Sequence, residues 1–312
     1  MADTCLLSRR RALSLAACGL LGCAKRSAGS GRRKVSLIVK SRENEFFQTM
    51  ENGAREHQRR HAAEYELLAS GTEDQYDAPK QIGLVERAIA AGVDAIVLAP
   101  IDSKALVPVC KRALDAQIVV VNIDNKLDPA VLGEKSFSVP FIGPNNRKGA
   151  RLAGQQLAKA LRPGDAVAIL EGQASSYNSG ERKRGFEDAM KAAGMRLVGS
   201  RAANWETDQA ERVTRELLAA HAELRGILAS NDTMALGAAS ALTAAGRTNE
   251  VLLVGFDNIS AARRLLGERR LLATVDHHAD RQAVFGIEYA LEILSKNAIP
   301  ADRETPVDLI TA

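Results

Sequence analysis

Residues 95–98 read Ala-Ile-Val-Leu and residues 118–121 read Ile-Val-Val-Val, and neither run alternates with polar residues. Strands of this kind are buried on both faces, which is typical of parallel sheets covered by helices. Between the two runs, Lys104–Asp115 carries apolar residues at helical spacing. This stretch therefore predicts a strand–helix–strand unit and decides the fold class, because parallel neighbouring strands need such a crossover.

The same alternation of strand and helix runs along most of the chain. Further short apolar runs predict strands at Val35–Val39, Glu66–Leu68, Val167–Leu170, Arg196–Val198, Gly226–Leu228 and Val251–Val254. Helical spacing is found at Phe47–His61, Pro79–Ala91, Lys148–Leu161, Glu181–Ala192, Asp208–Ala220 and Thr233–Ala244. The pattern forms a coarse repeat, with one set of units before Asn125 and another after Ala166. We therefore predict an α/β protein of two similar lobes, each a parallel sheet flanked by helices.

The repeat also predicts where the chain crosses between the lobes. Pro140–Pro144 contains two prolines and a glycine and is expected to be the linking stretch. The tail, with a predicted helix at Asp280–Ser295 and a predicted strand at Thr305–Ile310, would have to return across the hinge. We expect an N-terminal lobe of residues 35–141 plus 279–304 and a C-terminal lobe of residues 142–278 plus 305–312.

Residues 1–23 have the organisation of a bacterial export signal. Arg9–Arg11 precede an apolar run that is much shorter than the roughly 20 residues needed to span a bilayer. Leu20–Cys23 resembles a lipobox, in which the cysteine is lipidated, and Leu15–Cys18 is a second match with a shorter apolar run before it. The arginine cluster also resembles a twin-arginine signal, so the export route stays open. Residues 24–34 are expected to be a flexible tether.

The composition excludes several classes of function. The chain is 46% hydrophobic and 26% charged, with a net charge of +4 that owes much to the basic residues before position 35. A body near neutrality predicts no nucleic-acid partner. Cys110 is the one cysteine after the leader, and its helical pattern predicts a buried hydrophobic role. No spacing suggests a metal or cofactor, and no nucleophile motif suggests an enzyme.

Polar and aromatic residues follow the predicted strands, at the end of a parallel sheet where ligands bind. The segments are Lys40–Phe47, Asn122–Lys126, Ser175–Arg182, Asn204–Glu206, Ser230–Asp232, Phe256–Asn258 and Asp276–His278. Sugar hydroxyls are best served by planar side chains such as those of Asp, Asn and Arg, which make paired hydrogen bonds. Aromatic planes pack against the C–H faces of the ring. This mixture indicates a sugar or polyol ligand.

Five short motifs stand in order along the chain. They are Asn44–Phe47 (N-x-F-F), Asn122–Asp124, Arg182–Phe186 (R-x-x-G-F), Asn231–Gly237 (N-D-x-M-A-L-G) and Val254–Asp257 (V-G-F-D). Together they resemble the periplasmic sugar-binding proteins of ABC transporters, of the ribose-binding type. The resemblance covers nearly all of the chain after the signal. It implies the type 1 periplasmic binding protein fold, with lobes joined by a multi-strand hinge.

The resemblance also implies roles at the ligand site. Asp124 would bind two sugar hydroxyls, and Trp205 would stack on the sugar. His277 falls near the crossover, where ribose binders have an amide side chain. The residues expected to bind the ligand are Asn44, Phe46, Phe47, Asp124, Asn125, Arg182, Trp205, Asn231, Asp257 and His277.

Some of these residues also have a structural interpretation. Of Phe46 and Phe47, one is expected in the core at a helix start and the other at the ligand. Asn231 and Asp232 are both favourable helix caps. We expect Asp232 to be the cap and Asn231 to bind the ligand.

The sequence departs from the ribose binders at four positions. Asn125 replaces an arginine, Gly180 lies near the position of a second arginine, and Lys40 and Glu43 also differ. Arg182 or Asn178 could substitute for that second arginine, although Arg182 could instead pair with Glu181 or Asp188 on its own helix. These departures predict a different hydroxyl pattern, such as that of a hexose, a pentitol or an inositol.

We therefore expect a lipid-anchored substrate-binding protein of a sugar ABC importer, located in the periplasm or cell envelope. It would capture a monosaccharide or polyol between its lobes by hinge closure, as a monomer, and deliver it to a membrane permease and ATPase. The alternative is a sugar-sensing receptor that feeds a histidine kinase or chemotaxis system, because the core would be identical. Lactose-type repressors share this core, but here an export signal stands where their DNA-reading module would be.

The lipobox predicts one clear biochemical result. Replacing the lipidated cysteine removes the anchor, so Cys23→Ser should move the protein from the membrane fraction to the soluble fraction. The measurement is cell fractionation with immunoblotting, with Cys18→Ser as the matched control. Release by Cys18→Ser instead would assign the anchor to the other lipobox.

Overall fold

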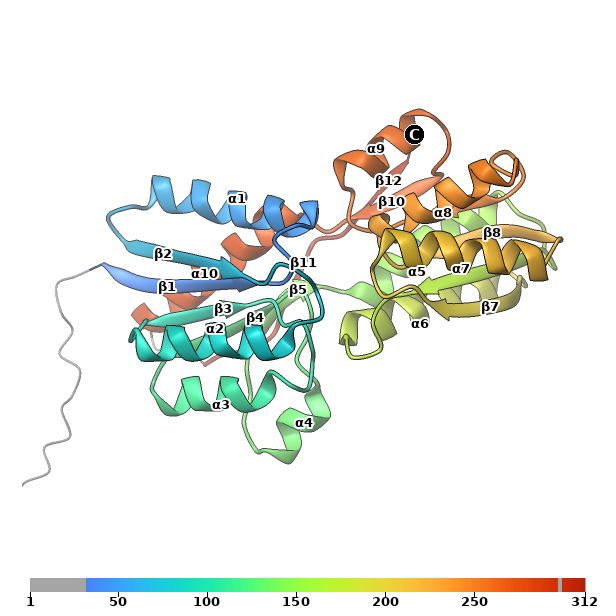
Figure 1. The fold of residues 1–312 in the computed structure, drawn as a ribbon. Coiled ribbons are helices and arrows are strands. Elements are labelled where there is room, and N and C mark those ends of the chain that lie inside the picture. The colour runs from blue at the N-terminus through green and yellow to red at the C-terminus, as the bar shows by residue number, and fades with distance from the viewer. Residues whose placement is uncertain (1–31, 297–298, 312) are drawn as a thin grey trace, which may run out of the picture. The chain divides into compact units, whose positions relative to one another are not determined.

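The computed structural model describes residues 32–296 and 299–311, and these form two six-stranded sheets flanked by helices (Figure 1). The predicted signal peptide, with Cys18 and Cys23, lies outside the described residues. The end of the predicted tether is corrected by the structure, because Arg33 and Lys34 already belong to a strand and pair with Tyr65 and Glu66.

The first sheet belongs to the N-terminal lobe and is parallel throughout, in the order β11-β5-β4-β3-β1-β2. Its strands are β1 (Arg33–Val39), β2 (Tyr65–Gly71), β3 (Ala95–Leu98), β4 (Val119–Ile123), β5 (Phe141–Pro144) and β11 (Arg303–Thr305). The helices of this lobe are α1 (Glu45–Arg60), α2 (Ala78–Ala90), α3 (Val107–Asp115), α4 (Pro129–Glu134) and α10 (Ala279–Lys296).

The second sheet repeats this plan in the C-terminal lobe, in the order β12-β10-β9-β8-β6-β7. Its strands are β6 (Ala166–Glu171), β7 (Arg196–Ala202), β8 (Leu224–Ala229), β9 (Leu252–Val254), β10 (Ala273–Asp276) and β12 (Asp308–Thr311), and only the β10–β12 pair is antiparallel. The helices are α5 (Asn146–Lys159), α6 (Tyr177–Ala192), α7 (Thr207–Ala220), α8 (Asp232–Ala244) and α9 (Ser260–Gly267). The predicted two-lobed α/β fold is confirmed.

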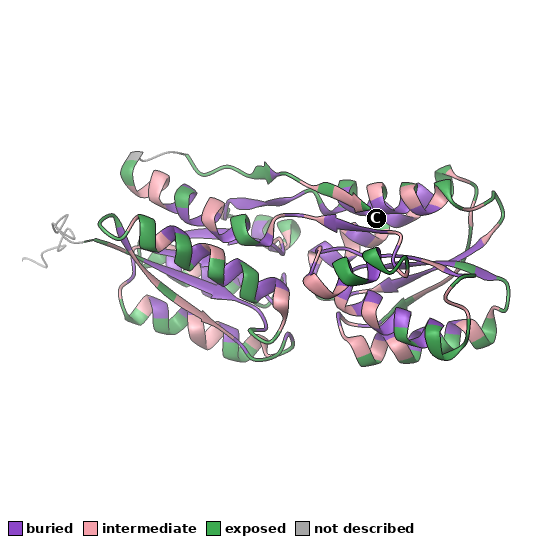
Figure 2. Ribbon diagram, turned by 90° about the horizontal axis from the view of Figure 1, so that it is seen from above, coloured by how far each residue is buried: buried purple, intermediate pink, exposed green. Residues whose placement is uncertain are grey.

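Both faces of each sheet are buried (Figure 2). In the N-terminal lobe, Ile96 and Leu98 pack with α2 and α3, whereas Val97 between them packs with α1 and α10. In the C-terminal lobe, Val167 and Ile169 likewise pack with α5 and α6 on one face. This two-sided burial explains why the central strands show no polar alternation.

The chain crosses between the sheets after β5, after β10 and between β11 and β12. Pro140–Pro144 is therefore not simply a linker, because Phe141–Pro144 pairs with β4 as a full strand of the first sheet. The predicted strand Thr305–Ile310 divides into two short strands that belong to different sheets. If each lobe is defined by its sheet, the N-terminal lobe contains the chain from β1 to Pro144 at the end of β5, together with α10 and β11, which ends at Thr305.

Two glycines of the sequence motifs are explained by close packing. A Cβ on Gly185 of α6 would lie 2.2 Å from the backbone oxygen of Arg147 on α5, so only glycine lets these helices approach. A Cβ on Gly255 would lie 2.1 Å from Oδ1 of the buried Asp232. None of the described helices is long and apolar enough to cross a membrane.

The α5–α6 contact predicts opposite effects for two glycines of one helix. Gly185→Ala should lower the free energy of unfolding by about 1–3 kcal/mol, because the backbone of α5 must shift. Gly180→Ala is the matched control, since only a distal Arg184 nitrogen comes within 4 Å of its added Cβ. This control should gain roughly 0.5–1 kcal/mol from the higher helix propensity of alanine. Urea unfolding measures both variants, and equal stabilities would contradict the packing described here.

Candidate functional site

A small cavity lies between the two lobes at the carboxyl ends of their strands. Six of its lining residues come from the N-terminal lobe and five from the C-terminal lobe: Lys40, Asn44, Phe46, Phe47, Gln75 and Asp124, then Asn178, Arg182, Trp205, Asn231 and Asp257. Among the described residues, no group of His, Cys, Asp and Glu is arranged to hold a metal ion.

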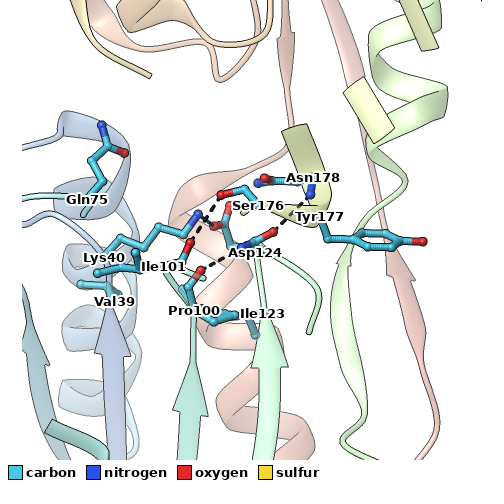
Figure 3. Close-up of polar contacts among 12 residues, drawn as sticks. Val39, Lys40, Gln75, Pro100, Ile101, Ile123, Asp124, Ser176, Tyr177 and Asn178 are labelled. Carbon is cyan, nitrogen blue, oxygen red and sulfur yellow. Dashed lines mark hydrogen bonds and ion pairs between the residues drawn. The ribbon is translucent and has the colours of Figure 1, made fainter. Parts of the chain in front are cut away.

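The N-terminal lobe contributes a buried ion pair to this cavity. Lys40 follows β1 and Asp124 follows β4, and Lys40 Nζ lies 3.0 Å from Asp124 Oδ2 (Figure 3). Their side chains are 5% and 3% exposed. Within the described part of the chain, Asp124 Oδ2 has this ion pair but no hydrogen bond. A carboxylate oxygen has two lone pairs, so it can accept a further hydrogen bond from a group in the cavity.

The C-terminal lobe contributes a second buried ion pair. Arg182 of α6 donates from NH1 to Asp257 Oδ1 at 3.1 Å, and also to the carbonyl of Ser230. Its Nε donates to Asn146, and its guanidinium carbon lies 3.7 Å from the centre of the Phe256 ring. Arg182 therefore pairs with Asp257 and not with Asp188 of its own helix, and each lobe presents one neutralised carboxylate.

Three residues that line the cavity adopt left-handed backbone conformations. The φ angles of Asp124, Trp205 and Asp257 are 59°, 70° and 117°. Residues other than glycine rarely adopt a positive φ, because it strains the backbone. Residues strained in this way cluster at functional sites, where the surrounding structure holds them in place. The sharp turn after β4 and after β9 directs each aspartate into the cavity instead of continuing the strand.

Aromatic rings form the apolar part of the cavity wall. Phe46 and Phe47 meet edge to face, with ring centres 5.1 Å apart. Trp205 is 5% exposed, and it lies so close to Gly172 that a Cβ there would be 2.0 Å from the indole. Because these rings come from both lobes, a flat ligand between them could pack against each.

Two amides of the cavity are oriented by helix capping. Asn44 Oδ1 accepts from Phe46 N at the start of α1, and Asn231 Oδ1 accepts from Met234 N at the start of α8. The cap occupies the oxygen end of each side chain and fixes the amide plane. Each amide group is thereby held at the cavity wall with its NH₂ end as the donor.

A model of the periplasmic binding protein domain matches residues 35–298 of this chain. The chain belongs to the periplasmic binding protein family. Among its relatives, the D-ribose/D-allose-binding protein of Pseudomonas aeruginosa is 51% identical over 89% of this chain and 89% of its own length. The ribose import binding protein of Escherichia coli is 30% identical, with 88% of each chain covered.

Solved structures give the same result. A solute-binding protein of an ABC transporter from Burkholderia multivorans is 50% identical, with a TM-score of 0.88 over 90% of this chain and 100% of that one. A periplasmic solute-binding protein from Actinobacillus succinogenes, solved with bound D-allose, is 32% identical, with a TM-score of 0.85 over 90% of this chain and 98% of that one. The predicted resemblance to ribose-type periplasmic sugar-binding proteins is confirmed. All four relatives are binding proteins, and the E. coli protein and the two solved structures are named as import or ABC transporter proteins, which confirms that the chain is not an enzyme.

Eight of the ten residues predicted from the sequence line the cavity, and Asn125 and His277 do not. His277 is fully buried behind the wall, where its Nε2 lies 3.0 Å from Asp257 Oδ1. Gln282 Nε2 donates to the His277 carbonyl and lies 2.6 Å from Nδ1, so Nδ1 accepts and Nε2 carries the proton. His277 therefore donates to Asp257 and orients it. Its ring also stacks on that of Phe46, with centres 4.5 Å apart.

Three residues that line the cavity were not predicted from the sequence to bind the ligand. Lys40 stands in the segment after the first strand and departs from the ribose binders there, and Asn178 enters only as a possible substitute for an arginine. Gln75 lies in the loop after β2, and its signal was available because it is a polar residue in the segment that follows a predicted strand. Asn178 Oδ1 is a second buried oxygen without a hydrogen-bond partner in the described part of the chain.

Asp232 corrects one of the interpretations made from the sequence. Asn231 is both a cavity residue and the cap of α8, whereas Asp232 is fully buried and accepts from Thr274 and Ile259. Burial raises the pKa of Asp232 well above its usual range, and the nearby charge of Asp257 adds to this. Cys110 is buried in α3 as predicted, and burial raises its pKa to about 12.

The contact between Gly172 and the indole predicts a spectroscopic change. Gly172→Ala should displace Trp205 from its buried position, because the new Cβ would overlap the ring. Trp205 is the only tryptophan, so its emission maximum should move to longer wavelength in this variant. Gly180→Ala serves as the control and should leave the spectrum unchanged. An unshifted spectrum for Gly172→Ala would show that the indole lies elsewhere.

Proposed function

We propose that this protein is the substrate-binding protein of a sugar ABC importer. It captures one monosaccharide or polyol between its lobes. The observation that carries this proposal is that two buried oxygens face one cavity from different lobes without making a hydrogen bond to any described residue: Asn178 Oδ1, and Asp124 Oδ2, which is in an ion pair with Lys40. Buried polar atoms need hydrogen-bond partners, and a ligand rich in hydroxyls supplies them. The sugar-binding names of the relatives support the same class of ligand.

The lining chemistry fits an aldose in its ring form. The carboxylates of Asp124 and Asp257 accept from hydroxyls, while Lys40 and Arg182 donate to oxygens of the same ring. Trp205 and the two phenylalanines pack against its C–H faces. Because each carboxylate is already neutralised by a cation of its own lobe, an uncharged ligand adds no unpaired charge. D-ribose and D-allose, named for the P. aeruginosa relative, are the first candidates.

Capture proceeds by closure of the lobes around the ligand. A ligand that makes hydrogen bonds to both lobes stabilises the arrangement in which they meet, and shifts the population toward it. The closed rims then form the surface that a membrane permease recognises. We infer that the protein works in the periplasm and that lipidation of Cys23 holds it at the membrane.

The proposed roles of the two aspartates predict how much sugar affinity is lost when either is replaced. Asp124→Ala and Asp257→Ala should each weaken sugar binding by roughly 30- to 1,000-fold, or about 2–4 kcal/mol, because desolvated hydroxyls lose a charged acceptor. The measurement is a titration followed by Trp205 fluorescence, with D-ribose and D-allose as ligands.

Asp188→Ala is the matched control, since it removes an aspartate that pairs with Arg147 outside the cavity. Its affinity should equal that of the unsubstituted protein. If Asp124→Ala and Asp257→Ala also bind with unchanged affinity, the ligand site is not this cavity.

A further inference from the structure

Helix α6 lacks a cap from its own lobe. The first N–H groups of any helix have no partner within it and are usually satisfied by the side chain of the N-cap residue. In α1, α2, α4, α5 and α8 an Asn or Asp supplies this cap. In α6 the N-cap residue is Ser176, and its side chain makes no cap hydrogen bond. Its hydroxyl instead donates to the carbonyl of Ile101 in the N-terminal lobe, at 3.4 Å (Figure 3).

The N-terminal lobe supplies the missing acceptors. Ser103 Oγ accepts from Tyr177 N at 2.9 Å, and Asn125 Oδ1 accepts from Asn178 N at 3.1 Å. The amide of Asn125 is held in this orientation because its Nδ2 donates to the carbonyl of Pro100 at 2.9 Å. Ser103, Asn125 and Asn178 are each at most 3% exposed. The cap of α6 is therefore buried between the lobes and built from both.

Helix α9 is capped across the lobes in the same way. Its N-cap residue, Ile259, has no side chain that could accept a hydrogen bond. Glu45, at the start of α1 in the N-terminal lobe, accepts from Ser260 N at 2.7 Å and from the Ser260 hydroxyl at 2.9 Å. A carboxylate at a helix N-terminus also interacts favourably with the helix dipole.

These contacts reach the cavity directly. Asn178 and Arg182 are one helical turn apart on α6, and both line the cavity. The cap holds the backbone of Asn178, whose unpartnered Oδ1 is one of the two oxygens that indicate a ligand. Tyr177 points the other way, so the cap orients the first turn with Asn178 toward the ligand (Figure 3).

We propose that closure of the lobes completes the caps of α6 and α9, and that Ser103, Asn125 and Glu45 are positioning residues for ligand binding. This inference rests on the proposed function. When the lobes separate, the capped N–H groups lose these acceptors, so each cap favours the closed arrangement whichever sugar is bound. A ligand that needs the closed arrangement has an apparent dissociation constant that rises as the closed fraction falls. The caps therefore set affinity but not specificity.

Single substitutions test the two caps separately. Ser103→Ala and Glu45→Ala should each raise the dissociation constants for D-ribose and D-allose by the same factor, roughly fivefold, since this is the usual effect of losing one cap. Glu45→Gln retains an acceptor oxygen and should stay near the affinity of the unsubstituted protein. The thermal midpoint without ligand should not change in either alanine variant.

Asp77→Ala is the control for ordinary capping. Asp77 caps α2 within the N-terminal lobe, so its loss should lower the thermal midpoint without ligand and leave affinity unchanged. The proposal is overturned if Ser103→Ala and Glu45→Ala behave like Asp77→Ala. It is also overturned if they weaken the binding of only one sugar, which would indicate direct ligand contact, or if they leave affinity unchanged.

Amide hydrogen exchange separates this proposal from the proposed function. If no sugar binds to the unsubstituted protein, the proposed function is wrong. If a sugar binds, it should increase the protection of the Tyr177 and Ser260 amides, and this increase should be lost at Tyr177 in Ser103→Ala and at Ser260 in Glu45→Ala. A sugar that binds without increasing the protection of these amides would overturn the caps and leave the proposed function standing.

Discussion

The burial of one carboxylate–cation pair in each lobe is the constraint on which the site depends. Lys40 with Asp124, and Arg182 with Asp257, are charges that a protein interior tolerates only when they are paired. Each pair lies where strands of a parallel sheet end, and the left-handed turn at each aspartate directs it into the shared cavity. The two lobes repeat this arrangement, and both pairs line one cavity.

The sequence predicted the architecture because the main strands are buried on both faces and the helices are amphipathic. It missed the elements that tertiary pairing defines. β5 is Phe141–Pro144, which reads as a linker because of its glycine and proline, yet it pairs with β4. The short β11 and β12 read as one strand, because local composition does not show that they belong to different sheets.

The sequence placed eight of its ten candidate residues at the cavity wall, but it could not show how side chains behind the wall are oriented. Resemblance places His277 and Asn125 near the ligand, but only geometry shows that His277 donates to Asp257 and that Asn125 caps α6. Neither side chain lines the cavity, but each makes a hydrogen bond to a residue that does. Gln75 was missed because only some of the strand ends were considered. Together these residues show that the cavity is held by contacts across the lobes as much as by its lining.

The measurement that tests the central claim most directly is a thermal-shift screen of residues 32–312 against pentoses, hexoses, polyols and nucleosides. A ligand at 100 times its dissociation constant adds about 2.7 kcal/mol to the stability of the folded protein. The account predicts a clear upward shift with one class of sugar or polyol, with D-ribose and D-allose as the first candidates. A folded protein whose midpoint is unchanged by every sugar and polyol would contradict it.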